Sequence, residues 1–141
     1  MPRVGKLEFL NALLCEDIRQ ERNNKYIIIG VYSGDIILQK VPSTVLVSLF
    51  VEMKVSKAGQ NTAKIRLAGP GEDSAVLDMA FETQQPNQVV TLAGPAMTVI
   101  MAKAGPFTVS ASTDGRKWVP IIEKQVILAS SQPSAIPSEM R

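Results

Sequence analysis

Carboxylates are the side chains of this sequence best suited to acid–base chemistry, because the chain contains no histidine. Asp17 alternates with Arg19 and Glu21, and Asp114 precedes Gly115 in a turn between two apolar runs. Two carboxylates at one site can divide the roles of acid and base or nucleophile. In an up-and-down order of strands, Asp17 and Asp114 fall at the same end. The sequence therefore allows a hydrolase or lyase with its site at one loop end, although an exposed ladder of charges explains the same residues.

Nucleophilic and metal chemistry is restricted by the same composition. Without histidine there is no Ser-His-Asp or Cys-His catalysis and no histidine-ligated zinc. Cys15 is the only cysteine, which excludes intrachain disulfides and cysteine-rich metal sites. Its neighbours Glu16 and Asp17 are negatively charged and disfavour a reactive thiolate. We expect Cys15 to be a buried structural residue, and we expect no cofactor.

Calcium binding is a second alternative. Asp35, Glu72 and Asp73 would meet at the other loop end. Calcium takes six to eight oxygen ligands, usually from several converging carboxylates, and the basic Lys40 and Lys103 share this end. A calcium-dependent, C2-like binding domain is therefore carried as an alternative, with no metal ligand assigned.

The residues with the best spacing for a protein contact lie near the end of the chain. Trp118 follows Arg116 closely, and tryptophan and arginine are enriched among the residues that dominate interface energies. Trp118 would equally serve to cap a core. Three hydroxyl residues alternate with apolar ones and predict a polar strand face that could contact a partner: Thr108, Ser110 and Ser112.

Composition restricts the partners and the compartment. The chain has 141 residues, 45% apolar and 20% charged, as expected for a single ordinary globular domain. Its net charge is only +2, and no basic run is interleaved with aromatic residues, so no nucleic-acid partner is expected. No run approaches the roughly 20 apolar residues of a membrane span, so no membrane partner is expected. The lone thiol, with no secretory signal in view, favours the cytoplasm.

Alternation of apolar and polar residues predicts the strands that must position these groups. Every odd position of residues 45–55 is apolar, as in a long half-buried strand. Shorter alternating or apolar runs predict further strands at residues 9–16, 63–67, 77–82, 96–102, 107–113 and 118–128. Residues 26–32 are apolar at nearly every position, which predicts a central strand covered on both faces. Gly30 within this run would mark a bulge or a close backbone approach.

Turn residues separate these runs and complete the fold prediction. Asp114-Gly115 predicts a hairpin, and Asn23-Asn24 predicts a turn before the strand at 26–32. Regular strands without an amphipathic helix favour an all-β protein, a single antiparallel β-sandwich of the immunoglobulin or C2-like kind with seven to nine strands. The predicted organisation is an N-terminal lead at 1–8, the sandwich at 9–128 and a disordered tail, rich in serine and proline, at 129–141.

The segment Leu14–Tyr32 resembles a domain-of-unknown-function family of small bacterial and phage-associated proteins. Its members begin with an apolar strand, an acidic step, a polar turn and a strand that contains Ile-Gly-Val. The later stretch from Ala104 to Gly115 is similar to a hairpin common in immunoglobulin-like sandwiches. The resemblance extends over residues 10–128 and implies a β-sandwich, with no activity, cofactor or catalytic residue attached.

The leading functional hypothesis is a non-catalytic protein-interaction or structural module, acting on a protein partner or as a homo-oligomer. A phage- or prophage-derived virion or assembly component is one form of this hypothesis, with a virion location in place of the cytoplasm. Sheet edges and hydroxyl-rich faces can associate with other strands. The carboxylate enzyme and the calcium-dependent domain are the alternatives.

Overall fold

Two β-sheets make up the part of the chain that the structure, a computed structural model, describes, namely residues 2–71 and 74–129. It contains eleven strands in these residues and, apart from one short 3-10 turn at Arg22–Asn24, no helix. The fold is therefore all-β, as predicted. Glu72, Asp73 and the tail beyond residue 129 lie outside the described residues.

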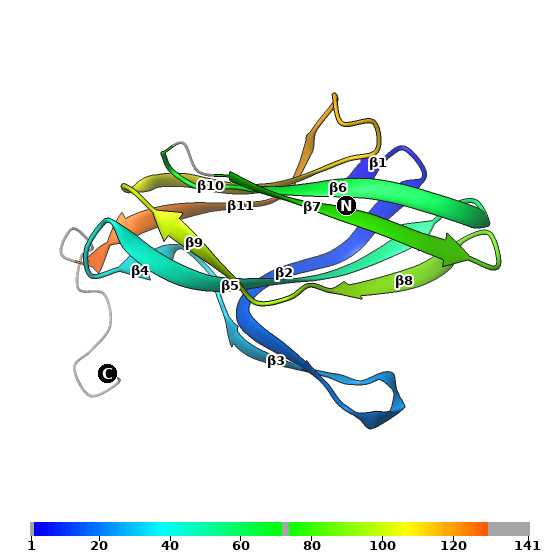
Figure 1. The fold of residues 1–141 in the computed structure, drawn as a ribbon, viewed down its shortest axis with the longest axis horizontal. Coiled ribbons are helices and arrows are strands. Elements are labelled where there is room, and N and C mark those ends of the chain that lie inside the picture. Colours follow the sequence, from blue (N-terminus) through cyan, green and yellow to red (C-terminus); the bar gives the residue numbers. More distant parts are fainter. Residues whose placement is uncertain (1, 72–73, 130–141) are drawn as a thin grey trace.

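The first sheet has six strands, which we call sheet A (Figure 1). Its path is β1-β2-β5-β8, while β3 pairs with β2 and β9 pairs with β5. All of these pairings are antiparallel. The strand bounds are β1 Arg3–Val4, β2 Leu7–Gln20, β3 Tyr26–Val31, β5 Ser43–Val55, β8 Gln88–Ala93 and β9 Met97–Met101.

The second sheet, sheet B, has five strands in the order β4-β11-β10-β6-β7. Only β4 and β11 run parallel, so the sheet is mixed. Its bounds are β4 Ile36–Leu38, β6 Gly59–Ala68, β7 Ser74–Thr83, β10 Gly105–Ser112 and β11 Val119–Leu128. The predicted hairpin at Asp114-Gly115 is confirmed, because β10 and β11 pair antiparallel across it.

The strand number is higher than the predicted seven to nine because three short strands, β1, β4 and β8, lie outside the predicted runs. β8 and β9 both pair with β5, one after the other along its length. Gly94 and Pro95 lie between them, and the N–H of Gly94 donates to the carbonyl of Leu49 over 2.8 Å. The chain therefore remains beside β5 before and after the Gly94-Pro95 break, first as β8 and then as β9.

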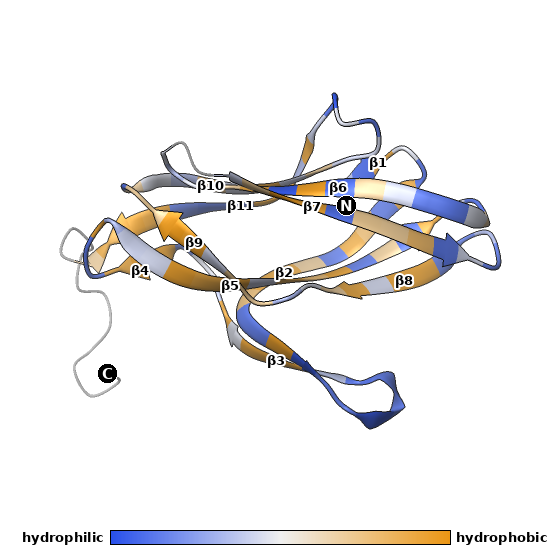
Figure 2. Ribbon diagram, viewed as in Figure 1, coloured by the Kyte–Doolittle hydropathy of each residue, from blue (hydrophilic) through white to orange (hydrophobic). Residues whose placement is uncertain are grey.

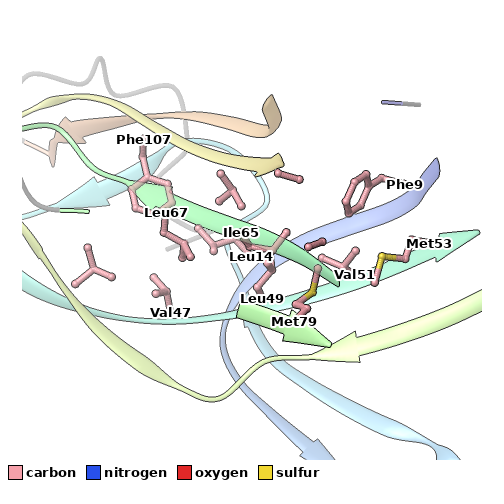
Figure 3. Packing of buried hydrophobic residues seen from close by; sticks show 14 of the residues in the cluster. Phe9, Leu14, Val47, Leu49, Val51, Met53, Ile65, Leu67, Met79 and Phe107 are labelled. Atoms are coloured by element: carbon pink, nitrogen blue, oxygen red, sulfur yellow. The ribbon is translucent and has the colours of Figure 1, made fainter. Parts of the chain in front are cut away.

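The core lies between the two sheets and follows the alternation seen in the sequence (Figure 3). The odd-numbered side chains of β5 from Val45 to Val55 are buried, and Val47, Leu49 and Val51 are fully so. Ile65 and Leu67 of β6 and Phe107 of β10 complete this core from sheet B. Each such side chain stabilises the fold by roughly 1.5–3 kcal/mol through burial. This packing makes the two sheets the scaffold for the exposed elements.

One hairpin of sheet A extends beyond the region where the two sheets pack on each other, and we call it the arm (Figure 1). It comprises residues 16–32: the last part of β2, the turn and β3. The prediction that residues 26–32 form a central strand covered on both faces is wrong. In the described part of the chain β3 pairs with β2 alone, and it exposes Ile27, Ile29 and Val31. Figure 2 shows an apolar β3 joined to a hydrophilic tip.

Candidate protein-interaction surface

The arm exists because its two strands differ in character. From Glu16 to Gln20 the side chains of β2 are mostly charged or polar, so this half of the strand cannot enter a core without a large desolvation cost. β3 pairs with this half, in a register that places Asp17 opposite Ile29 and Arg19 opposite Ile27. The pairing therefore holds an apolar strand outside the core.

The turn at the tip depends on two asparagines. Asn23 and Asn24 adopt φ values of 64° and 58°, a left-handed conformation that asparagine tolerates better than most residues. The N–H of Glu21 donates to the carbonyl of Lys25 over 2.7 Å and closes the turn. The predicted turn is thus confirmed, and it fixes where β3 begins.

Three side chains on one side of β3 form an exposed apolar surface. Ile27, Ile29 and Val31 expose 44%, 39% and 44% of their surfaces. They are alternate residues of one strand and so point to the same face. We call this surface the β3 apolar face. Large aliphatic side chains are seldom exposed next to one another. Where they form a contiguous exposed patch, the patch usually marks an interaction site.

The opposite face of the arm is directed toward sheet A. The ring of Tyr26 meets that of Phe50 on β5 edge to face, with 5.9 Å between the ring centroids and 68° between the planes. A groove of about 390 Å³ separates this face from residues 93–95, with Ile18, Gln20 and Tyr26 on the arm side. The arm is therefore supported from one side, while the β3 apolar face is open.

The second edge of β3 is also open. Within the described residues β3 has only β2 as a neighbour, so backbone N–H and C=O groups along its other edge meet no strand. Native proteins usually protect such edges with charged residues, prolines or a covering segment. β3 carries none of these between Tyr26 and Val31. Strand addition is thus sterically and chemically open at this edge.

The base of the arm is anchored at Tyr32. Its hydroxyl donates to the carbonyl of Leu46 on β5 over 2.8 Å, and its N–H donates to the carbonyl of Leu14 over 2.9 Å. Burial raises the pKa of Tyr32, and the negative charge of Glu16 adds to this rise. An open groove of about 500 Å³ lies here, lined in part by Ile37 and Leu46. The anchoring hydroxyl is therefore held in its protonated, donating form.

Charge is distributed unevenly along the arm. Glu16 and Asp17 lie at the base, and Asp17 accepts a hydrogen bond from the N–H of Ile18 and lies 3.5 Å from the Arg19 guanidinium. The tip carries the cations Arg22 and Lys25, together with Glu21. The arm thus has an acidic base and a tip with a basic excess.

The residues that the sequence nominated for contact lie elsewhere, on sheet B. The guanidinium of Arg66 stacks on the ring of Trp118, 4.2 Å from its centroid, so the half-buried Trp118 already has a cationic neighbour. Arg116 is exposed in the turn before it. The Trp118 ring is therefore partly occupied within this chain.

The expected hydroxyl face of β10 is largely covered. Thr108 is half-buried, whereas Ser110 and Ser112 are buried. Ser110 lies between Arg66 of β6 and Pro120 of β11 in the ladder, and only 6% of its surface is exposed. A fully exposed face was the wrong interpretation for these two serines, because both are buried in the folded chain.

Ser112 is used inside its own turn. Its hydroxyl donates to Oδ1 of Asp114 over 3.0 Å and accepts from the N–H of Gly115 over 2.8 Å. Asp114 also accepts from the N–H groups of Arg116 and Lys117. These bonds lower the pKa of Asp114 to about 2, with the Lys117 N–H making the largest contribution.

The two carboxylates of the enzyme alternative do not meet. Asp114 lies beside Gly5 at a cavity of about 250 Å³, near the start of β2. Asp17 is ten residues beyond Leu7 on that strand. At the usual rise per residue of a strand, this corresponds to about 33 Å between Leu7 and Asp17. No group of three or more acidic or cysteine side chains that could hold a metal ion occurs in residues 2–71 and 74–129. Of the carboxylates considered for calcium, Glu72 and Asp73 lie outside the described residues.

Cys15 is buried where β2 leaves the core, as the sequence predicted. Its thiol lies 3.5 Å from the carbonyl of Ser48 and 3.6 Å from that of Asp17. Burial is the main cause that raises the pKa of Cys15, and the negative charges of Asp17 and Glu16 raise it further. The hydrogen bond to the Asp17 carbonyl lowers the pKa but does not cancel the rise. The thiol is thus suited to packing rather than to nucleophilic attack.

Sequence reasoning overlooked the β3 apolar face because it assigned Ile27 and Ile29 to a buried strand. The polar run Glu16–Gln20, followed by the Asn23-Asn24 turn, contained the necessary information. β3 pairs with this polar half of β2, and Ile27 and Ile29 are exposed there.

Comparisons of the sequence with known proteins assign it to no family. The described residues form no helix that is both long and apolar enough to span a membrane. A scan against protein-family models finds no matching family, and a search of curated proteins finds no match.

Proposed function

We propose that this chain is a non-catalytic protein-interaction or structural module whose contact element is the arm. The observation that carries the proposal is the β3 apolar face, which stands on a strand with an open edge in the described structure. Apolar side chains supply binding energy by leaving water, and an open edge supplies backbone hydrogen bonds. Both contributions are available at one place.

The chemistry of the remaining groups also supports a binding role. Asp114 is engaged in its turn, and the Cys15 thiol is buried. A general base has to be near its substrate with a pKa close to the working pH. The lowered pKa of Asp114 makes it a poor base.

Several finer expectations belong to this proposal. They are membership of the family that Leu14–Tyr32 resembles, an immunoglobulin- or C2-like form of the two-sheet fold, and a cytoplasmic or virion location. A protein partner or a second copy of the chain is the expected binding partner. The family, the subclass of the fold and the location are not needed for the arm to act as a contact element.

Site-specific photo-crosslinking in the source cell tests the proposal. A photoreactive amino acid replaces Ile27 on the β3 apolar face, and in a matched control it replaces Val76 on β7, which is exposed to 49%. We expect a discrete crosslinked species from position 27 that disappears when Ile29→Lys is added, and none from position 76. Equal crosslinking at both positions, or crosslinking that Ile29→Lys does not change, would contradict the arm as contact element.

A further inference from the structure

We propose that the occupant of the open β3 edge is β3 of a second copy of the chain. The two strands pair antiparallel about a two-fold axis, with Ile29 of each copy opposite Ile29 of the other. This inference rests on the proposed function of the arm and names its partner. It joins the two arms into one four-stranded sheet, β2-β3-β3-β2, outside the two domain cores.

The apolar pattern of β3 is complementary to itself in this register. Ile27 of one copy lies opposite Val31 of the other, and the reverse pair follows from the two-fold axis. Opposite side chains of an antiparallel pair share a face, so the two β3 apolar faces become one continuous stripe. No charged residue lies between Tyr26 and Val31 to interrupt it. Cross-strand contacts between β-branched residues are among the favourable pairs of a sheet.

The charges of the arm select the antiparallel orientation. A parallel pairing would bring the two basic tips together and the two acidic bases together. The antiparallel pairing places Lys25 of each copy beside residues 33–35 of the other, near Asp35 and the acidic base. Asp17 is already paired with Arg19 of the same arm, at 3.5 Å, and Lys124 donates to the carbonyl of Gly34 over 3.0 Å. Glu16 and Asp35 have no ion pair among residues 2–71 and 74–129, so their charges can attract the opposing tip.

The position of the arm suits such pairing. Figure 1 shows that it extends beyond the two sheets, and its inner face rests on sheet A through Tyr26 and Phe50. A second arm can therefore add to β3 without a change in either core. The contact is isologous and closes on itself, which yields a dimer rather than a fibre.

Sedimentation of the full chain over a range of concentrations tests the proposal. We expect a reversible dimer for the wild type and about tenfold weaker association for Ile29→Lys, equivalent to about 1.4 kcal/mol. The matched control is Ile100→Lys on β9, where the isoleucine is exposed to 49%. It should leave the dimer unchanged. A wild type that stays monomeric at high concentration, or equal losses for both variants, would overturn the proposal.

Charge reversal tests the orientation. One variant carries Glu16→Lys and Asp17→Lys at the base, and another carries Arg22→Glu and Lys25→Glu at the tip. Each should dimerise more weakly than the wild type, and an equimolar mixture should form heterodimers. Circular dichroism confirms that both remain folded, and a variant that fails this control is replaced by its single substitutions. A mixture that associates no better than its components would refute antiparallel pairing.

The outcomes separate this inference from the proposed function. If the wild type is monomeric but Ile27 crosslinks to a different protein in the cell, the arm is a contact element and the self-pairing proposal is wrong. If neither dimer nor specific crosslink forms, both proposals are wrong. A dimer that Ile29→Lys weakens and Ile100→Lys does not, together with crosslinks between two copies, supports both.

Discussion

The carboxylate of Glu16 lies over Gly30, in the space that a β-carbon on residue 30 would occupy. The register that pairs Cys15 with Val31 and Asp17 with Ile29 places these two residues opposite each other at the base of the arm. Gly30 also has φ of 66°, a left-handed conformation that favours glycine. The backbone conformation therefore favours glycine at the base of the arm, and a β-carbon there would also displace the Glu16 side chain.

Substitution of Gly30 should loosen the arm. Gly30→Ala is expected to lower the free energy of unfolding by about 1–2 kcal/mol from the backbone conformation, with a further loss from displacement of Glu16. Urea denaturation measures the change. Gly115→Ala estimates the backbone contribution, because Gly115 has a similar φ of 75° and its β-carbon position meets only Lys64 side-chain atoms, at 3.8 and 3.9 Å. Gly34→Ala, with neither constraint, should be neutral, and a loss there as large as at Gly30 would contradict this account.

Two fully buried serines should respond in opposite ways to alanine. The hydroxyl of Ser48 is buried on β5 without a hydrogen-bond partner in the described structure, whereas that of Ser112 bonds to Asp114 and Gly115. Ser48→Ala removes an uncompensated polar group and should stabilise the fold by up to about 1 kcal/mol. Ser112→Ala should destabilise it by about 1 kcal/mol or more. Thermal melts of the pair measure both signs, and a destabilised Ser48→Ala would indicate a partner for that hydroxyl.

The alternation in β5 was enough to predict its strand, because in a strand every second side chain, here Val47 and Leu49, points to the same face, and that face is buried. The same reasoning failed for Ile27 and Ile29. A run of apolar residues indicates only that its burial would be favourable. Here the run pairs with the mostly charged or polar segment Glu16–Gln20, and the strand lies outside the core. The prediction for Ser110 failed for another reason: Ser110 is buried although it alternates with apolar residues, and this burial arises from tertiary packing that no local pattern contains.

The stacking of Arg66 on Trp118 should appear as a coupling energy. Arg66→Ala, Trp118→Ala and the double variant form a cycle, in which we expect about 0.5–1 kcal/mol of coupling in stability. Arg116→Ala is the matched control, since Arg116 is exposed in the adjacent turn and should not couple to Trp118. Sedimentation of Trp118→Ala also tests its suggested role as an interface anchor. Lower stability with unchanged association would assign Trp118 to the fold rather than to a partner.

The pH dependence of stability should report on the turn at Asp114. Its pKa is lowered to about 2 in the folded chain because backbone N–H groups, that of Lys117 first, and the Ser112 hydroxyl donate to the carboxylate. In the unfolded chain the pKa returns to the ordinary 3.8. Unfolding therefore takes up protons between these values, so the stability from this group is complete above pH 3.8 and is lost as pH falls toward 2.

Removal of the carboxylate tests this assignment. Asp114→Ala should be less stable than the wild type near neutral pH, and the difference in unfolding free energy should shrink as pH falls from about 4 to 2. Urea denaturation at a series of pH values measures it. Asp35→Ala is the control, because Asp35 is exposed and has no hydrogen bond or ion pair in residues 2–71 and 74–129. A difference between wild type and Asp114→Ala that stays constant over this range would show that the carboxylate does not hold the turn in its ionised form.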